Sequence, residues 1–597
     1  MVPTMRMLKK SGWFLPALVL IALVPRLLYF NEIRTRADFE NPGLDAGYHD
    51  YWARGLAFGQ WAPPHDQPDP MVQQLPYFRP PGYPYFLALV YALTGGSHAA
   101  ARLLQFALGI LNAVLLYLLA RQIFGEMPAR IGALLAATFW TLIYYEGELL
   151  EPVLSITLLL LLLFAFHEWT RSMKLLWLAG AGVLMGLSAL VRPNALLFLP
   201  VAVLWAAWYL RGHSSWLRET FRAAVLLSVG LAVTVLPATI RNYVVARDVV
   251  LISANSGINL LLGQDPDAIV DHASDETGHW NCFQYPALLA SASAEAGRDL
   301  KPSEASRWHA QKAWHQIVTR PRVTAQLMVL KTLLFWGPLE VSNNKVEELE
   351  RTASPVLRGL TLRFSFLFAW SLVGLFGAWR AMRGGASRAA TAMAVLIVLL
   401  VGIYFGSFLP YIAAGQYRAP IVPLLAAFAG VGLWEALRPL LKGNLRTAAC
   451  WLVPGLVLWG LASINVTGYR PNEAHWHLMR GISEERAGNL AAAEGAFREA
   501  VQTRPALDVA HQRLGAALAQ QERYEEAIES FERVLELTPD NVDARHSIGL
   551  ALALLGRVEE AIPHFEAVVR ARPGYREARH NLQQAYWVTG RTPPPDL

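Results

Sequence analysis

Residues 151–166 read EPVLSITLLLLLLFAF. After the glutamate and the proline this stretch is almost wholly apolar, and about 20 such residues cross the hydrocarbon core of a bilayer as a helix. The rest of the chain has the same character: 54% of its 597 residues are hydrophobic and only 16% are charged, against roughly 25% in soluble domains. The mean hydropathy of +0.29 agrees, so the composition indicates an integral membrane protein.

Similar apolar runs recur through most of the chain. Eleven are long enough to span a membrane: 12–30, 100–120, 130–145, 152–168, 176–191, 195–210, 223–240, 363–380, 389–410, 420–437 and 447–466. Two shorter runs, 82–95 and 325–338, fit helices that lie at the interface or re-enter, and counting them would give 12–13 spans. The first run has basic residues before it and no small-residue cleavage site after it, which predicts an anchor. We expect an all-α, polytopic helix bundle over residues 1–468.

Lys and Arg gather in alternate short loops, and this bias orients a membrane protein. With the N-terminus inside, every inner loop is basic: Arg121 and Arg130; Arg171 and Lys174; Arg211, Arg218 and Arg222; Arg380, Arg383 and Arg388; Arg438, Lys442 and Arg446. The loop 31–99, the segment 241–362 and everything after residue 466 then lie outside. The net charge of +6 therefore reflects orientation, not nucleic-acid binding.

The polar tail carries an internal repeat with a step of 34 residues. The recurring positions are Gly481, Gly515 and Gly549; Ala493, Ala527 and Ala561; Phe497, Phe531 and Phe565; Pro505, Pro539 and Pro573. Small residues let two helices cross closely, the Phe fills the groove, and the Pro ends the second helix. This pattern resembles the tetratricopeptide repeat. We predict a soluble α-solenoid over 469–597, with repeats at about 473–506, 507–540 and 541–574 and a capping helix at 575–590.

Four arginines stand at the outer ends of spans, against the orientation rule: Arg79, Arg192, Arg241 and Arg418. Each alone could cap helix carbonyls or extend to the membrane surface. Together at one membrane face they favour a site for a phosphorylated ligand, because guanidinium groups bind phosphate through two parallel hydrogen bonds.

Carboxylates lie on the same face. Asp45 and Asp50 belong to the first outer loop, where Asp45 also suits the N-cap of a helix. Glu151 opens an apolar run, and an acid at the membrane edge that faces the bundle interior is usually functional. Glu146 and Glu148 fit the surface better than Glu151, although Glu148 is a candidate supporting acid with Asp50.

Other motifs point to no further chemistry. His272, His279 and Cys282 are close in sequence, but their spacing fits no zinc signature, so we predict no metal site there. The two cysteines, Cys282 and Cys450, cannot form a disulfide framework. Phosphate-cradling glycine loops and serine-hydrolase motifs are absent from the sequence, which argues against nucleotide-driven chemistry and a serine hydrolase.

In their order and topology the motifs of residues 12–466 resemble the GT-C class of polytopic glycosyltransferases, nearest its protein O-mannosyltransferase and aminoarabinose-transferase branch. The resemblance rests on Asp45 with Trp52 and Ala53, Arg79-Pro80-Pro81 before an aromatic segment, Glu151-Pro152, Arg192-Pro193, Pro237 with Arg241-Asn242-Tyr243, and Tyr417-Arg418-Ala419-Pro420. The chain departs from the pattern at Ala46, where several relatives carry a second acid, and at His49, where an aromatic residue is common. Its fourth-span acid is Glu instead of the frequent Asp.

The resemblance implies transfer of a sugar from a polyprenyl-phosphate-linked donor to an acceptor hydroxyl, with inversion, on the periplasmic side of a bacterial inner membrane. Asp45 would be the general base. Arg79, Arg192, Arg241 and Arg418 would bind the donor phosphate, with Arg418 the first candidate. Glu151, Asp50 and Glu148 would support the base or the sugar. No nucleotide is implied, and a divalent metal remains open.

Two alternatives remain open. The same chemistry could act on a lipid or a cell-surface glycan, although the repeats favour a protein acceptor or partner. The chain could instead be a non-catalytic membrane scaffold or a lipid-linked glycan transporter. A scaffold would tolerate loss of Asp45 and Arg418, whereas a transferase would not.

Overall fold

A computed structural model describes residues 12–64, 67–266 and 282–592, which form two compact units. The first unit holds residues 12–35 with most of the chain from Leu44 to Pro471. The second holds the segment from Asn472 onward together with residues 36–43. Throughout the described residues the regular structure is helical, without strands.

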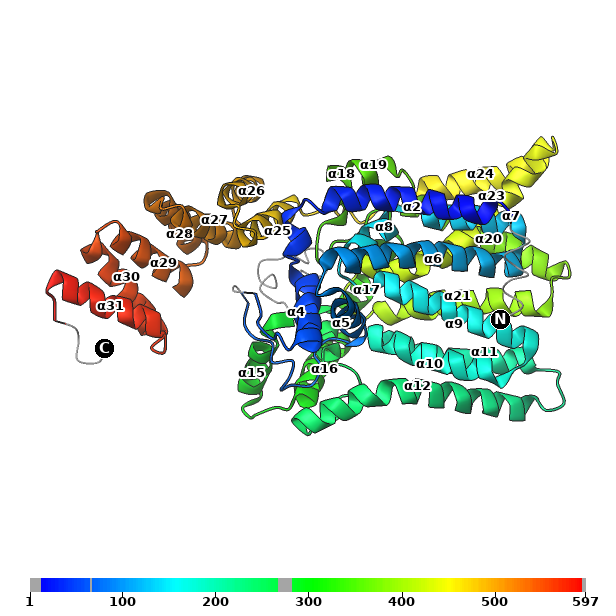
Figure 1. Cartoon of the computed structure of the whole chain (residues 1–597), viewed down its shortest axis with the longest axis horizontal. Helices are drawn as coiled ribbons and strands as arrows, with labels where there is room; N and C mark the ends of the chain where they lie inside the picture. The colour runs from blue at the N-terminus through cyan, green and yellow to red at the C-terminus, as the bar shows by residue number, and fades with distance from the viewer. Residues whose placement is uncertain (1–11, 65–66, 267–281, 593–597) are drawn as a thin grey trace. The chain divides into compact units, whose positions relative to one another are not determined.

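Among the described residues of the first unit, nine helical segments are long and apolar enough to cross a membrane (Figure 1). They are α2 (Phe14–Ile33), α6 (His98–Phe124), α9 (Pro152–Ser172), η1 with α11 (Pro193–Leu210), α12 (Trp216–Ala246), α20 (Phe364–Arg383), α21 (Arg388–Phe408), α22 with η3 and α23 (Gly415–Leu441) and α24 (Leu445–Ala462). A tenth segment is the pair α7 (Glu126–Ala137) and α8 (Trp140–Gly147), bent by 48°. The apolar helix α10 (Leu175–Val191) is shorter, at 17 residues. Every one of the eleven predicted runs thus coincides with helix.

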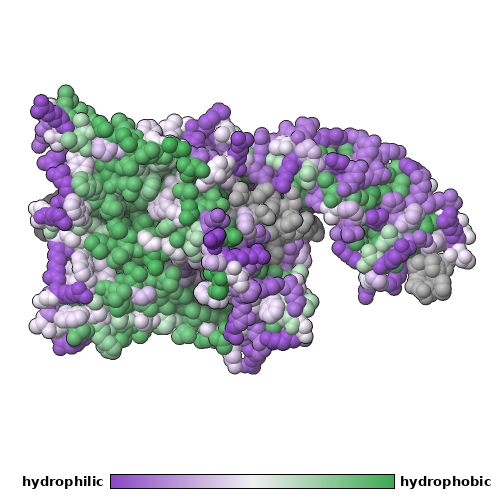
Figure 2. All heavy atoms as spheres, turned by 180° about the vertical axis from the view of Figure 1, so that it is seen from behind, coloured by the Kyte–Doolittle hydropathy of each residue, from purple (hydrophilic) through white to green (hydrophobic). Residues whose placement is uncertain are grey.

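Small residues bring the central helices together. A Cβ added at Gly374 of α20 would lie 1.7 Å from the carbonyl oxygen of Phe428 in α23. On another side of α23, a Cβ at Gly430 would lie 2.2 Å from the carbonyl oxygen of Pro128 in α7. Close backbone approach of this kind is how helices associate where lipid removes the hydrophobic drive between them. The outward side chains are apolar, and Figure 2 shows this broad hydrophobic surface.

Shorter helices of the first unit connect the spans. They are α4 (Leu44–Phe58), α5 (Gly82–Thr94), α13 (Ser256–Leu262), η2 (Cys282–Gln284), α15 (Tyr285–Ala296), α16 (Pro302–Thr319), α17 (Pro321–Trp336), α18 (Glu347–Ala353) and α19 (Pro355–Gly359). The two doubtful apolar runs of the sequence, 82–95 and 325–338, fall on α5 and α17, neither of which qualifies as a span. In Figure 1, α4, α5, α15 and α16 gather at one end of the bundle.

Glu146 corrects one expectation from the sequence. The side chain is not on the surface: Glu146 is 3% exposed and accepts two hydrogen bonds from the guanidinium of Arg26 on α2, at 2.6 and 2.8 Å. Arg26 also donates to the carbonyl oxygens of Ala22 and Ala137. Because a charge inside an apolar bundle needs a partner, the arginine in the first span determines where Glu146 lies.

The second unit consists of paired helices and a final single one. They are α3 (Ala37–Glu40), α25 (Glu473–Arg486), α26 (Leu490–Thr503), α27 (Asp508–Gln520), α28 (Tyr524–Leu537), α29 (Val542–Leu554), α30 (Val558–Ala571) and α31 (Arg576–Thr589). In each repeat a Cβ on the recurring glycine would meet the recurring phenylalanine ring; the distance from Gly515 to Phe531 would be 2.7 Å. The packing role that the sequence assigns to these two positions is therefore visible in the structure.

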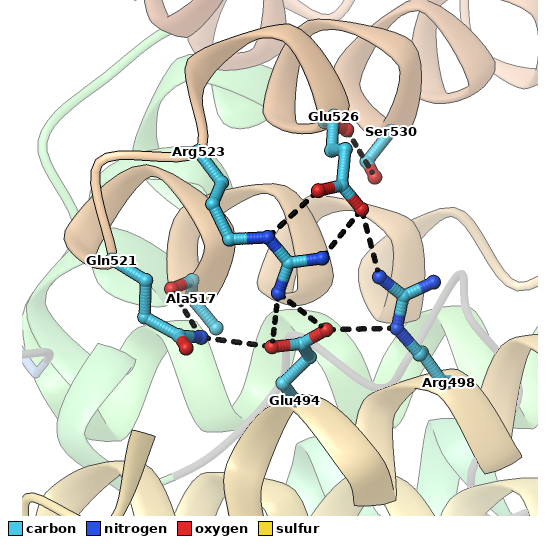
Figure 3. Close-up of polar contacts among 7 residues, drawn as sticks. All are labelled: Glu494, Arg498, Ala517, Gln521, Arg523, Glu526 and Ser530. Carbon is cyan, nitrogen blue, oxygen red and sulfur yellow. Dashed lines mark hydrogen bonds and ion pairs between the residues drawn. The ribbon is translucent and has the colours of Figure 1, made fainter. Parts of the chain in front are cut away.

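A polar network on this unit joins consecutive repeats (Figure 3). The guanidinium of Arg523 donates to both carboxylate oxygens of Glu494 on α26 and to those of Glu526 on α28. Arg498 bridges the same two glutamates, and Gln521 donates to Glu494 at 3.0 Å. These contacts connect the second helix of one repeat to the helices of the next.

Candidate functional site

Asp45 lies in the first turn of α4 and is 7% exposed. One carboxylate oxygen, Oδ1, accepts a hydrogen bond of 2.6 Å from Nη2 of Arg79, which precedes α5. The other, Oδ2, accepts from Nδ2 of Asn344 at 3.1 Å. The backbone N–H of Asp45 in turn donates to Oδ1 of Asn344 at 3.2 Å. The carboxylate is thus held at both oxygens by residues distant in the chain.

Cys282 completes the contacts of Asp45 and Arg79. Its sulfur accepts a hydrogen bond of 2.8 Å from Nε of Arg79, and its thiol lies 3.5 Å from Oδ1 of Asp45. Burial raises the pKa of this thiol to about 12, so the group stays protonated and can donate to the carboxylate. No hydrogen bond within the described residues uses Nη1 of Arg79, and this side chain keeps a quarter of its surface exposed.

The charge state of Asp45 follows from these neighbours. Burial by itself raises the pKa of the carboxyl, but the positive charge of Arg79, the nearby His49 and the hydrogen bonds from Asn344 and Cys282 outweigh it and lower the pKa below its ordinary value. Asp45 is therefore ionised at neutral pH and can only accept hydrogen bonds.

A second ion pair lies beside the first. Nη2 of Arg192, at the end of α10, donates to Oε1 of Glu151 at 2.8 Å and to the carbonyl oxygen of Gln416 at 3.2 Å. The guanidinium of Arg192 lies 5.3 Å from the ring centre of Tyr417. The side chain of Gln416 accepts from Nδ2 of Asn344 at 3.2 Å and so links the two ion pairs.

The resulting chain of contacts runs Arg79–Asp45–Asn344–Gln416–Arg192–Glu151, and we call it the outer cluster. His49 lies one turn after Asp45 on α4, with its Nδ1 3.0 Å from the carbonyl oxygen of Leu149. Burial lowers the pKa of His49 despite the opposing charges of Glu151 and Asp45. The cluster therefore combines two carboxylates and two guanidinium groups.

Arg418 lies outside this cluster. Its guanidinium is 2% exposed, forms an ion pair of 2.7 Å with Glu340 and donates to the carbonyl oxygens of Phe335, Gly337 and Leu339. All its donors are engaged within the protein, and it anchors α22 to the segment that follows α17. The phosphate role predicted for it stays a prediction, and the contacts give it a structural task.

Arg241 also makes structural contacts. Its guanidinium donates to the carbonyl oxygens of Val72 and Leu75 and lies 4.1 Å from the ring centre of Tyr77. The adjacent Asn242 accepts from the backbone N–H of Tyr77 at 3.0 Å. These bonds attach the segment that carries Arg79 to α12.

The other two supporting acids, Asp50 and Glu148, are paired elsewhere. Asp50 accepts from Tyr91 at 2.6 Å and from Arg54 at 3.0 Å, and lies 2.7 Å from Nε2 of His98. Glu148 forms an ion pair of 2.7 Å with Lys345. Neither joins the outer cluster, and Glu148 is not on the surface, since 12% of its side chain is exposed.

The structure describes only one of the three residues considered as metal ligands in the sequence, Cys282. His272 and His279 lie outside the described residues, and Cys282 contacts Asp45 and Arg79. Within the residues that the structure describes, no group of three or more His, Cys, Asp or Glu side chains is arranged to hold a metal ion.

Reasoning from the sequence missed four residues: Asn344, Gln416, Cys282 as a partner of Asp45, and Glu340. Asn344 lies in a connecting segment and Gln416 in the short helix α22, and their neutral side chains give no hydropathy or charge signal. Glu340 could have been found, because Arg418 at a membrane face needs a counter-charge.

Comparisons with known proteins identify two parts of the chain. Residues 78–240 match the family described as dolichyl-phosphate-mannose-protein mannosyltransferase, a range that contains Arg79, Glu151 and Arg192. Residues 464–508 and 513–576 match the tetratricopeptide repeat family. The resemblance stated from the sequence is confirmed to this extent: a segment of the membrane unit matches a glycosyltransferase family, and the tail matches tetratricopeptide repeats.

Further comparisons add less. A search of curated proteins found no match. Among solved structures, the first TPR of Spaghetti (RPAP3) bound to an HSP90 peptide is 19% identical, covers 20% of this chain and 94% of its own, and gives a TM-score of 0.20. MamA 41-end from Desulfovibrio magneticus RS-1 is 21% identical, covers 27% of this chain and 84% of its own, with a TM-score of 0.20.

Proposed function

We propose that this chain is an integral-membrane glycosyltransferase that moves a sugar, by the family match a mannose-like hexose, from a polyprenyl-phosphate-linked donor to an acceptor hydroxyl. The observation that carries the proposal is the carboxylate of Asp45, paired with Arg79 and connected through Asn344 and Gln416 to Arg192. Both arginines lie inside the matched family region. Such a site offers a base for the acceptor hydroxyl and cations for the departing phosphate.

In the proposed reaction Asp45 accepts the proton of the acceptor hydroxyl as that oxygen attacks the anomeric carbon. The new glycosidic bond forms while the bond from the anomeric carbon to the phosphate oxygen breaks, and the configuration inverts. The electron pair of the broken bond remains on the departing polyprenyl phosphate. Arg79 and Arg192 stabilise that charge, a preorganised electrostatic role that is often the largest catalytic contribution.

An apolar groove suits the donor's lipid tail. It lies between α2 and α19 and is lined almost wholly by apolar side chains: Leu20, Ile21, Val24, Pro25, Leu28, Thr138, Pro355, Val356, Gly359 and Leu360. An isoprenoid chain would find only hydrocarbon surface there, apart from Thr138, and so would lose no polar contacts.

The remaining parts of the proposal concern sidedness and partners. The basic inner loops favour a site on the outer face of a bacterial inner membrane, with the solenoid on the same side. Solenoids of this repeat present an extended surface for peptides or proteins, which favours a protein as acceptor or as recruited partner. A glycan or lipid acceptor would require the same catalytic residues.

The test compares membranes from cells that express the wild type or Asp45→Asn at matched levels, fed a labelled sugar precursor. Asparagine keeps the shape of the side chain but cannot take a proton, so transfer should fall by about 10²- to 10⁴-fold while label accumulates in polyprenyl-linked sugar. Asp299→Asn, at an exposed aspartate of the other outer segment, 241–362, is the matched control.

The fraction that loses label identifies the acceptor as protein, lipid or glycan. Unchanged label in every fraction would overturn the role of Asp45 and would favour a scaffold or a transporter.

A further inference from the structure

We propose that Asn344 is the positioning residue of the outer cluster: its side-chain amide holds the carboxylate of Asp45 in register while Arg79 serves the donor phosphate. This inference rests on the proposed function and assigns a task to a residue that contacts the base and carries no charge. It begins from one geometric fact, that Asn344 bonds both the side chain and the backbone of Asp45.

The hydrogen-bond pattern fixes the orientation of the Asn344 amide. Its Oδ1 accepts from the backbone N–H of Asp45, and its Nδ2 donates both to Oδ2 of Asp45 and to Oε1 of Gln416. A flipped amide would place an oxygen against the carboxylate of Asp45 and against the amide oxygen of Gln416 and would turn its NH₂ toward an N–H donor. Only one orientation satisfies all three partners.

The segment that carries Asn344 is held in place by several contacts. The backbone N–H of Ser342, two residues earlier, donates to the hydroxyl of Tyr469 at 3.0 Å. The N–H of Gly415 donates to the carbonyl oxygen of Val341 at 2.7 Å, which ties this segment to α22. The ion pair of Arg418 with Glu340 also connects α22 to this segment. Arg418, the most buried of the four outer arginines, therefore helps to fix the position of Asn344.

The two ligands of the Asp45 carboxylate differ in what they can do during a reaction. Arg79 is a partly exposed cation whose Nη1 forms no hydrogen bond with the residues that the structure describes, so a donor phosphate can compete with Asp45 for it. Asn344 is neutral and has no affinity of this kind for phosphate. When Arg79 turns toward the phosphate, the amide keeps Oδ2 fixed. Oδ1 then keeps only its long contact with the Cys282 thiol and can accept a hydrogen bond from the acceptor hydroxyl, as a base requires.

Loss of the amide has a defined electrostatic consequence. In the described part of the chain, the ionisable groups that face Asp45 are Arg79 before α5, His49 on α4, Cys282 in η2 and Tyr417 in α22. Asn344 contributes a hydrogen bond to the ionised form of Asp45, so removing that bond favours protonation and raises the pKa of the carboxyl. The acid limb of a pH profile that depends on ionised Asp45 must then move to higher pH.

The experiment uses the purified full-length chain with synthetic polyprenyl-phosphate mannose as donor and extracted membrane protein as acceptor. For Asn344→Ala we expect kcat to fall about 10- to 100-fold through misalignment of the base, with the KM for the donor within about threefold of wild type. The midpoint of the acid limb of the kcat/KM profile should move to higher pH by about half a pH unit to one pH unit. Asn344→Ser restores a hydrogen-bond donor and an acceptor, so it should recover part of the lost kcat and part of the shift in the acid limb.

Asn194→Ala is the matched control. Asn194 is also partly buried, lies just after Arg192, and uses its Nδ2 to donate to Ser407 at 2.8 Å, without a bond to Asp45. Its removal should leave the pH profile unchanged. An Asn344→Ala profile that keeps its acid limb, or a loss that appears only in the KM for the donor, would overturn the proposal.

A second measurement does not depend on turnover. The infrared titration of the Asp45 carboxyl, taken as the difference between wild type and Asp45→Asn, should shift to higher pH in the Asn344→Ala background and stay in place in the Asn194→Ala background. If the wild type shows no transfer and the titration still shifts in Asn344→Ala, the positioning bond is supported and only the proposed reaction is refuted. If the titration does not shift, the positioning bond itself is refuted.

Discussion

The solenoid and the outer cluster use their residues in opposite ways. In the solenoid the same glycine–phenylalanine contact recurs in each 34-residue unit, between two helices that are neighbours in the chain. In the outer cluster every contact occurs once, and its partners are far apart in the sequence: 34 residues for Arg79 with Asp45, 41 for Arg192 with Glu151, and 299 for Asn344 with Asp45.

This difference determines what each region can lose. A repeated local contact contributes only a part of the solenoid's stability, because each repeat contacts mainly its neighbours and the same contact recurs in the other repeats. A unique long-range contact has no copy, and when it involves a buried charge its loss leaves the partner charge without compensation. The comparison therefore predicts that single substitutions have larger effects in the membrane unit than in the solenoid.

Arg418→Ala tests the largest of these effects. The change leaves Glu340, which is 2% exposed, without its cation and frees the carbonyl oxygens of the segment after α17. We expect a loss of about 3–5 kcal/mol in the free energy of unfolding. The measurement is the temperature at which half of the detergent-solubilised protein is no longer monodisperse.

The double variant Arg418→Met with Glu340→Gln is the control, and it should regain part of the stability because no charge is left buried alone. If Arg418→Ala were as stable as wild type and only the KM for the donor rose, Arg418 would be a phosphate ligand, as the sequence predicts, and its contacts with Glu340 would carry little weight.

The same contrast explains how much the sequence could predict. Each apolar run became a helix because hydropathy acts over consecutive residues, and the repeats were predicted correctly because their period is local. Asp45, Arg79, Glu151 and Arg192 could be proposed together because helix ends at one membrane face must meet. Asn344 could not, since a neutral amide in a connecting segment differs in no local property from any other asparagine.

Glu146 shows the limit from the other side. Its position in a polar turn suggested the surface, but its partner Arg26 stands 120 residues earlier in an apolar span. A charge in the middle of a span demands a buried counter-charge. Searching for that partner would have corrected the expectation, although the sequence alone does not say which of the available acids it is.

Gly515→Ala tests the close glycine–phenylalanine crossing in the middle repeat of the solenoid. The new Cβ would lie 2.7 Å from the ring of Phe531, which is 2% exposed and cannot move aside. Overpacking of this kind costs about 1–3 kcal/mol. We expect faster amide hydrogen exchange in α27 and α28 of the full-length protein, with exchange in the membrane unit unchanged.

Gly495→Ala is the matched control, because Gly495 is an exposed position of α26 and an added Cβ would meet nothing within 4 Å. Alanine should stabilise that helix by about 0.5–1 kcal/mol relative to glycine. If both variants behaved alike, backbone entropy would dominate and the close helix crossing would not be what the recurring glycine serves.

Arg523→Gln should give the smallest effect. Arg523 bridges Glu494 and Glu526 at an exposed junction between repeats (Figure 3), and exposed ion pairs contribute little because water and salt screen them. Exchange in α28 should rise by less than about fivefold at low salt, and the difference from wild type should vanish in 1 M salt. A larger, salt-independent effect would mean that this network holds the repeats in register as a buried contact does. The solenoid would then depend on single residues, as the outer cluster does, and the contrast between the two regions would fail.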